Sequence, residues 1–311
     1  MFGAGNREEM DREDYDVRRR RWLRAGFWRG IGLVFLIFAL LIGLGFAFGD
    51  RPRSGPHIAM IDIQGVIYDD PILDKKLAEI EVSEAAQALI LRINSPGGTT
   101  AGSEALYERL RTISERKPIV VTMGEVAASG GYITAIAADH IIARGNTITG
   151  SIGVILEYAH FEEFLDRIGV EIETVKSDSL KGGPSPFRPP TPEQRALEKS
   201  MIEDTYRWFR DLVGARRGLS GAALDAVADG RVFTGRQALE AGLIDAIGGY
   251  DDALLWLAAH DSVAPDLPVD LYMPDYPEDS FLGTIGRFLS TGVGLTGLSY
   301  ASGPRLYSLA R

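Results

Sequence analysis

Residues 119–138 read IVVTMGEVAASGGYITAIAA, and this stretch decides the fold. It opens with the near-continuous apolar run Ile119 to Met123. Such runs are found in strands that are covered on both faces of a sheet. A turn of small residues follows, Ala127 to Tyr132, and the apolar segment Ile133 to Ala138 predicts a helix. A buried strand that leads directly into a helix is typical of βα units, so we expect an α/β fold around a largely parallel sheet.

The same pattern continues on the amino-terminal side of this stretch. Two apolar runs of strand length precede it, His57 to Ile63 and Ala88 to Asn94. After the second run, Leu106, Leu110 and Ile113 recur at helical spacing, which predicts an amphipathic crossover helix.

Helix signals dominate the chain after residue 190. Thr191 can cap a helix whose first turn holds Pro192, and this helix is predicted to end near Gly214 to Gly218. Two short helices follow, each with a glycine suited to a C-cap: Ala222 to Ala228 before Gly230, and Gln237 to Ala241 before Gly242.

A hydrophobic segment near the start predicts a membrane anchor. Residues 30–49, GIGLVFLIFALLIGLGFAFG, carry no charge, and a helix of about 20 residues spans a bilayer core of about 30 Å. A cleavable signal peptide is the alternative, but its apolar region is shorter and Ala47-Phe48-Gly49 is a poor exit site. Arginines are concentrated in the leader 1–29, so the positive-inside rule predicts a single-pass protein of the cytoplasmic membrane with residues after Asp50 outside.

Composition sets the remaining boundaries. A linker, residues 50–56, separates the anchor from a globular domain predicted over 57–273, and 45% apolar residues are enough for its core. From Pro274 the chain is rich in proline, glycine and serine, and its sequence does not indicate which structure the tail 274–311 adopts.

The composition also excludes several classes of function. A net charge of −10 argues against a nucleic-acid partner. There is no cysteine, and the four histidines lie in no metal-ligand spacing, so we expect neither a metal nor a cofactor. Residues 292–297 fit G-x-G-x-x-G, but no strand precedes them, so they do not predict a dinucleotide site.

Ser129 stands where a nucleophile could stand. It lies at a strand-to-helix turn among small residues, with the Gly130 amide next to it as a donor. The alternative is an ordinary N-cap serine. The turn 95–98, SPGG, is a second place where glycines can direct amides into a cleft.

A serine nucleophile needs a base, and no histidine is well placed for that role: His57, His140, His160 and His260 all lack suitable surroundings. A lysine can act instead, because desolvation lowers the pKa of a lysine from about 10.4 towards neutrality. Lys181, in the glycine- and proline-rich segment 176–184, is the candidate. The alternative is a surface lysine.

These pieces together resemble the signal peptide peptidase A (SppA) family of Ser-Lys proteases in its short, single-repeat form. The resemblance covers roughly His57 to His260 and rests on the following segments: LRINSPGG, MGEVAASGGYI, NTITGSIGVI, ETVKSDSLKGGPSPFRPPT and DGRVFTGRQALEAGLIDAIGGYDDA.

The resemblance implies a catalytic role for each of five residues. It makes Ser129 the nucleophile and Lys181 the general base, with the amides of Gly98 and Gly130 as the oxyanion hole and Ser151 as the hydrogen-bond partner of the lysine amine. It also implies a ClpP/crotonase-like fold of repeated ββα units in which substrates bind as added strands. The expected substrates are hydrophobic peptides such as remnant signal peptides, and the expected assembly is a ring-like homo-oligomer whose dyad is shared between chains.

Other classes of function stay open at this point. Ser114 to Lys117 match S-x-x-K of penicillin-binding enzymes, but neither S-D-N nor K-T-G is present. A Ser-His-Asp hydrolase could pair Ser129 with His260. A crotonase-like acyl-thioester enzyme, or a membrane scaffold without activity, would use the glycine turns without a nucleophile.

Overall fold

The computed structural model describes residues 32, 33, 36, 55–260, 262–264, 266–274 and 306–309. The chain divides into two compact units, Met1–Arg53 and Ser54–Arg311. Gly32, Leu33 and Leu36 are the described residues of the first unit, and they are helical. Most of the predicted span 30–49 therefore lies outside the described residues, and within the described part no helix has the length and apolar content needed to cross a membrane.

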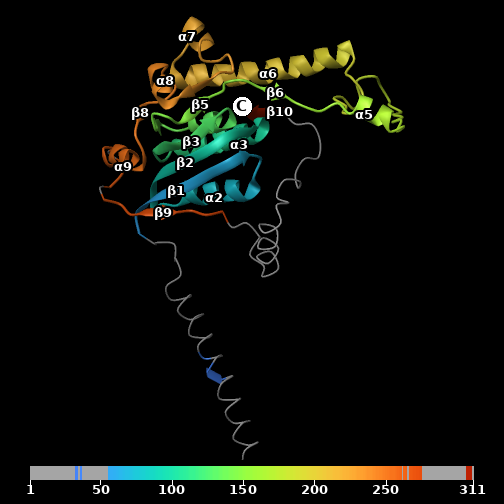
Figure 1. The fold of residues 1–311 in the computed structure, drawn as a ribbon. Helices are drawn as coiled ribbons and strands as arrows, with labels where there is room; N and C mark the ends of the chain where they lie inside the picture. Colours follow the sequence, from blue (N-terminus) through green and yellow to red (C-terminus); the bar gives the residue numbers. More distant parts are fainter. Residues whose placement is uncertain are drawn as a thin grey trace, which may run out of the picture. The chain divides into compact units, whose positions relative to one another are not determined.

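The second unit is built on one mixed sheet that contains ten of the described strands (Figure 1). Its centre is parallel, in the order β1 (His57–Ile67), β2 (Ala86–Thr99), β3 (Ile119–Ala128), β4 (His140–Ala143) and β8 (Ala246–Ile247). The flanking strands are β5 (Ile148–Gly150) beside β3, β7 (Val232–Thr234) beside β5, β9 (Val269–Leu271) beside β1, and β10 (Leu306–Leu309) between β2 and β6 (Ile155–Leu156). The predicted α/β class is confirmed.

Helices cover both faces of this sheet because alternate residues of its central strands face opposite sides. On β2, Leu89 and Leu91 belong to one buried apolar cluster while Ile90 belongs to the other. Burial of one such side chain stabilises the fold by about 1.5–3 kcal/mol. The first cluster takes side chains from α2 (Pro71–Val82), α3 (Thr100–Ser114), α4 (Gly130–Ala135) and α6 (Pro192–Arg217), and the second takes them from α9 (Tyr250–Ala258).

Several predicted helix boundaries are confirmed and others need correction. Thr191 accepts a hydrogen bond from the Gln194 amide and caps α6, which ends at Gly218 with a φ of 67°. Helix α4 begins at Gly130 rather than Ile133, because the chain turns into the helix directly at Ser129.

The two short helices after α6 also differ from their predicted bounds. Helix α7 (Gly221–Asp225) stops before Ala228, so Gly230 lies beyond its C-cap. Helix α8 (Gly235–Glu240) starts earlier than Gln237, because the Thr234 side chain accepts a hydrogen bond from the Gln237 amide and caps it.

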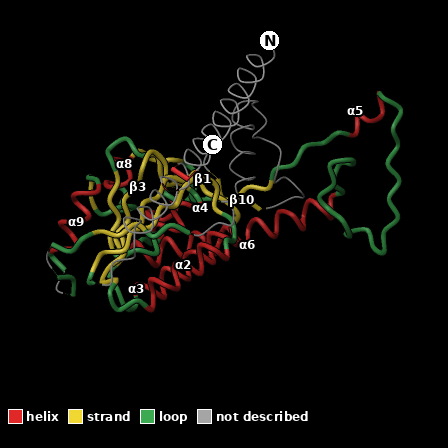
Figure 2. The backbone as a smooth tube through the Cα atoms, turned by 90° about the horizontal axis from the view of Figure 1, so that it is seen from below, coloured by secondary structure: helices red, strands yellow, loops and turns green. Residues whose placement is uncertain are grey.

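A long segment between β6 and α6, residues 157–191, projects beyond the sheet, and we call it the arm. It contains α5 (Glu162–Arg167), and both views show it extending past the rest of the unit (Figures 1 and 2). Large apolar side chains of the arm are exposed, including Phe164 at 60%, Ile168 at 57% and Val175 at 92%. The arm thus presents apolar surface that the rest of the described chain leaves exposed.

Candidate active site

The turn between β3 and α4 holds Ser129 in an unusual backbone conformation. Its φ of 56° and ψ of −117° lie in a region that non-glycine residues seldom occupy, and such strain costs on the order of 1–3 kcal/mol. The Ser129 amide donates to the carbonyl of Gly150 at 2.8 Å, which fixes the turn against β5. Ser129 is the N-cap residue of α4, but unlike an ordinary N-cap serine its side chain makes no capping hydrogen bond. Strain of this kind is a common property of functional sites.

Gly98 and Gly130 meet beside this turn. A Cβ atom at Gly130 would lie 2.9 Å from the Gly98 nitrogen and 2.3 Å from the Ser103 Oγ. A Cβ atom at Gly98 would lie 1.8 Å from the Ile67 carbonyl oxygen of β1. Only glycine fits at either position, and the close packing brings the backbones of the two predicted oxyanion residues together.

Ser151 lies one strand away from Ser129. It follows β5, whose Gly150 pairs with Ala128 of β3, and its φ is 52°. Its amide donates to the Arg231 carbonyl at 2.8 Å, and the residue is 7% exposed. Ser151 also lines an open cleft of about 710 Å³ together with residues 152–155 and 228–232. The structure therefore gathers Ser129, Ser151 and the two glycines at the carboxyl ends of neighbouring strands.

Lys181 is not part of this cluster in a single chain. It lies in the arm, exposed, with its amide donating to the Asp178 carbonyl at 3.1 Å. The cleft that it lines, about 720 Å³, is formed by residues 174–194 alone. The arm extends beyond the sheet (Figure 2), whereas the residues of α4 are buried in the core.

Helix α4 is anchored at both ends by residues that the sequence did not reveal. The Tyr132 hydroxyl donates to the Leu243 carbonyl at 2.8 Å, and complete burial raises the pKa of this phenol. Arg216 of α6 donates to the carbonyls of Ile136 and Ala138 at 2.7 and 2.8 Å. Cations at a helix C-terminus complement its dipole, so this contact holds the helix that follows Ser129.

We predict that Arg216→Met lowers the free energy of unfolding by about 1–3 kcal/mol, because it leaves two carbonyls without their charged donor. Burial lowers the pKa of the Arg216 guanidinium, which shows that this side chain is partly desolvated where it contacts α4. Urea denaturation measures the change. Arg207→Met is the matched control on the same helix, since Arg207 is 70% exposed and bonds residues of its own helix. Equal losses in the two variants would contradict the anchoring role.

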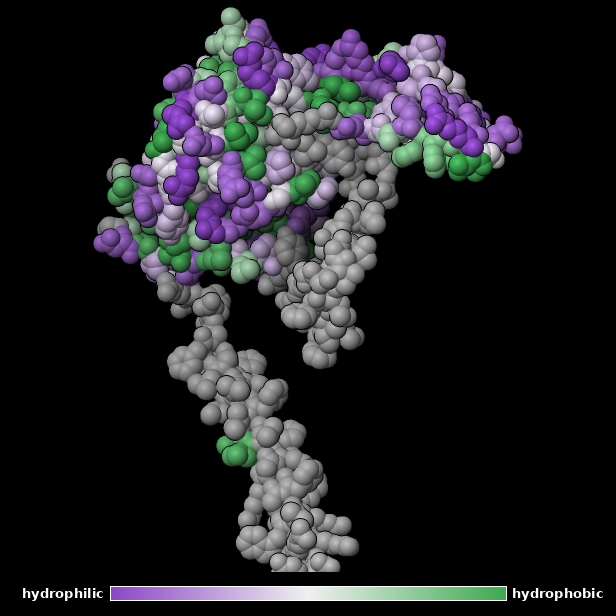
Figure 3. All heavy atoms as spheres, viewed as in Figure 1, coloured by the Kyte–Doolittle hydropathy of each residue, from purple (hydrophilic) through white to green (hydrophobic). Residues whose placement is uncertain are grey.

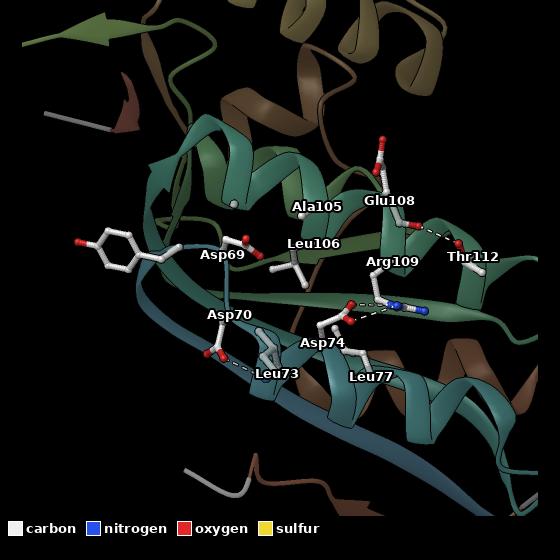
Figure 4. A pocket seen from close by; sticks show the side chains of 12 residues that line it. Asp69, Asp70, Leu73, Asp74, Leu77, Ala105, Leu106, Glu108, Arg109 and Thr112 are labelled. Atoms are coloured by element: carbon white, nitrogen blue, oxygen red, sulfur yellow. Dashed lines mark hydrogen bonds and ion pairs between the residues drawn. The ribbon is translucent and has the colours of Figure 1, made fainter. Parts of the chain in front are cut away.

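The cleft between α2 and α3 has a structural explanation. Figure 4 shows Asp74 and Arg109 joined across it, with nitrogen–oxygen distances of 2.7 and 3.1 Å. Asp70, on its rim, accepts hydrogen bonds from the amides of Ile72 and Leu73 and caps α2. Asp74 thus joins α2 to α3, and Asp70 caps α2. Among the described residues that line the cleft there is no serine or histidine.

The histidines lie in other surroundings. The His260 ring packs near Trp256, and its Nδ1 lies 2.9 Å from the Ser262 Oγ. The Nε2 atom of His57 lies 2.8 Å from the Tyr272 hydroxyl oxygen. No cluster of potential metal ligands occurs among the residues that the structure describes.

A serine in a strained strand-to-helix turn, next to two closely packed glycines, is an arrangement typical of serine hydrolases. Comparison with known proteins gives the family. The sequence pattern of peptidase family S49 matches residues 111–264, and the pattern of Clp proteases matches residues 62–145. The chain belongs to peptidase family S49, which includes SppA and protease 4, and it is a serine protease. The resemblance found in the sequence is thereby confirmed.

Relatives of different lengths share this region. A Synechocystis protein named as a protease is 39% identical over 218 residues, covering 70% of this chain and 78% of the relative. An Enterococcus faecium protein named as a signal peptide peptidase SppA is 30% identical, covering 76% and 80%. The chloroplastic serine protease SPPA of Arabidopsis thaliana is 37% identical, covering 65% of this chain and 29% of the relative. Among solved structures, a variant of the 1510-N membrane-bound stomatin-specific protease aligns with a TM-score of 0.48 and 16% identity, covering 71% of this chain and 100% of that chain.

Proposed function

We propose that this serine protease is a membrane-anchored endopeptidase that uses a Ser129–Lys181 dyad. One contrast in the fold carries the proposal. Ser129, Gly98, Gly130 and Ser151 gather at one point, whereas Lys181 lies on a projecting arm that has apolar surface to offer to a second chain.

Each residue has a defined part in the proposed reaction. The Ser129 Oγ attacks the scissile carbonyl carbon while the unprotonated Nζ of Lys181 takes the hydroxyl proton. The amides of Gly98 and Gly130 stabilise the oxyanion that forms. The lysine then gives its proton to the leaving amine, and water hydrolyses the acyl-enzyme with the same base. The Ser151 hydroxyl accepts a hydrogen bond from the lysine amine and orients it.

The arm supports a shared site in a ring-like homo-oligomer. Figure 3 shows hydrophobic residues along one side of the end of the arm, which includes the exposed Phe164 and Ile168. Exposed apolar surface of this kind is typical of protein interfaces. In the proposed assembly, the arm of one chain brings Lys181 to the Ser129 turn of its neighbour, which also desolvates the amine.

The proposed anchor sets where the enzyme works. Residues 30–49 cross the cytoplasmic membrane with the leader 1–29 inside, and the protease domain, residues 57–273, faces the extracytoplasmic side. Tethered beside the bilayer, the domain would act on hydrophobic peptides that remain in the membrane, such as remnant signal peptides. Neither a metal nor a cofactor has a part in the reaction.

Complementation tests the shared site. Ser129→Ala chains and Lys181→Ala chains are each expected to be inactive, and co-assembly of the two should restore peptide hydrolysis, because some interfaces then pair an intact serine with an intact lysine. Chains that carry both substitutions, mixed with Ser129→Ala chains, are the control and should stay inactive. A co-assembled mixture of the single variants without activity would place the dyad within one chain or remove it altogether.

A further inference from the structure

A small apolar pocket lies between the start of α6 and residues 176–184 of the arm, which we call the lysine loop. Its volume is about 180 Å³, which suits a single side chain rather than a drug-sized molecule. Its apolar walls include Leu156 of β6, Leu180 of the lysine loop, and Leu197 and Met201 of α6. Leu180 is 43% exposed and the other two leucine and methionine walls on α6 are each 47% exposed, so these walls are open to a ligand.

The pocket is held in shape by a hydrogen bond between two of its sides. The Gln194 Nε2 of α6 donates to the Ser179 carbonyl of the lysine loop at 3.1 Å. Gln194, Leu197 and Met201 recur at a spacing that places them on one face of the helix. The lysine loop is therefore fixed against this face of α6, and the pocket is a built feature of the chain.

Glu198 is the charged residue among the described residues that line this pocket. Its Oε2 accepts a hydrogen bond from the Tyr158 hydroxyl at 2.9 Å. Its Oε1 is buried and has no hydrogen-bond partner within the described chain. Arg195, one turn earlier on α6, lines a neighbouring cleft rather than this pocket. A buried carboxylate oxygen without a donor is unfavourable, so a ligand that brings a donor to it binds more tightly.

The pocket lies beside the proposed general base. Leu180 directly precedes Lys181 in the sequence, and consecutive Cα atoms are about 3.8 Å apart. Because one wall of the pocket belongs to the lysine loop, the pocket stays next to Lys181 whether the base serves the Ser129 of its own chain or that of a neighbour. A peptide whose carbonyl carbon lies at that serine therefore brings a nearby side chain to the pocket.

We propose that this pocket is a substrate subsite that selects a basic side chain, lysine or arginine, close to the scissile bond. The inference rests on the proposed function, because it takes Lys181 as the working base. The apolar walls suit the methylene stem of a basic side chain, and the Glu198 carboxylate suits its terminal cation. The terminal torsion of glutamate turns easily, so one oxygen can face the pocket while the other keeps its bond to Tyr158.

The subsite narrows the class of substrate. It favours hydrophobic peptides that carry a basic residue over peptides that are apolar throughout. Signal peptides combine the two features, since a positively charged region precedes their apolar core. The preferred cleavage sites would then lie where these two regions meet.

Binding by catalytically inactive chains tests the subsite without requiring turnover. All chains carry Ser129→Ala, and the probes are two fluorescein-labelled peptides of leucine and alanine that differ at one central position. One peptide has lysine there, and the other has norleucine, which lacks the cation. Fluorescence anisotropy should show that the lysine peptide binds about tenfold or more tightly, and that Glu198→Gln removes this preference. Equal affinities for the two peptides, or a preference that survives Glu198→Gln, would overturn the inference.

Two further variants separate the pocket from general effects of charge and folding. Glu203→Gln makes the same change of charge on α6, at a residue that is 58% exposed and pairs with Lys199, and it should keep the preference for lysine. Glu198→Lys should reverse the preference, so that a peptide with glutamate at the central position binds better than the lysine peptide. Each variant is judged by a ratio of two affinities, so a purely structural role of Glu198 would weaken both peptides equally and leave the ratio unchanged.

Hydrolysis of the same peptides by chains with Ser129 intact distinguishes the subsite from the proposed chemistry. The value of kcat/KM should be about tenfold or more higher for the lysine peptide, and Glu198→Gln should abolish this difference. Hydrolysis without a preference for lysine would overturn the subsite and leave the proposed function standing. A preference in binding without hydrolysis would leave the subsite standing, and the proposed chemistry would fail.

Discussion

Peptide hydrolysis is expected to fall by a factor of about 10⁴ or more when Ser129 is replaced by alanine, because loss of the attacking hydroxyl removes the covalent route entirely. A serine-reactive probe should raise the intact mass of the native chain by one adduct and leave the Ser129→Ala chain unmodified. Ser200→Ala, on the exposed side of α6, is the control and should keep both activity and labelling. Turnover by a pure Ser129→Ala preparation would refute the nucleophile assignment.

Ser129→Gly separates a catalytic from a structural role for the same residue. Glycine adopts a φ of 56° without the strain that serine bears there, so this variant should be as stable as the native protein or more stable by about 1 kcal/mol. It should nevertheless be as inactive as Ser129→Ala. If Ser129 served only the fold, the stable Ser129→Gly variant would remain active, and its activity would be lost only as the protein unfolds in a urea titration.

Lys181→Arg is expected to lower the rate by about 10²–10⁴-fold, the usual contribution of a general base. The guanidinium keeps the positive charge and the hydrogen-bond donors but does not release its proton near neutral pH, so it cannot accept one from Ser129. Lys176→Arg, in the same segment of the arm, is the matched control and should retain activity. A Lys181→Arg enzyme with a near-native rate would remove the lysine from the mechanism, and a rate that EDTA lowers would contradict the expected absence of a metal.

The parts of the fold that follow local rules were predictable from the sequence. Continuous apolar runs gave the central strands β1, β2 and β3, and the Thr191 cap with its following proline gave the start of α6. The turn at Ser129 was found for the same reason, because a strand-to-helix turn of small residues is a local feature. Its strained φ was not predictable, since serine ordinarily avoids that region.

Contacts between distant segments were beyond the reach of local rules. The four residues of β10 form a strand only because β2 and β6 offer two open edges to them, so the tail carried no strand signal of its own. Arg216 reaches α4 from a helix that reads as an ordinary charged surface. The position of Lys181 depends on the path of the arm, and loop sequence alone does not specify which chain the arm will meet.

The two-residue strand β6 connects the sheet to the root of the arm. Within the described part of the chain, β6 is joined to the sheet by β10, and the arm begins directly after it at residue 157. The pairing with β10 therefore holds the root of the arm, and loss of this pairing would leave the root without its lateral hydrogen bonds. We therefore expect the pairing of β6 to be coupled to the order of the segment that carries Lys181.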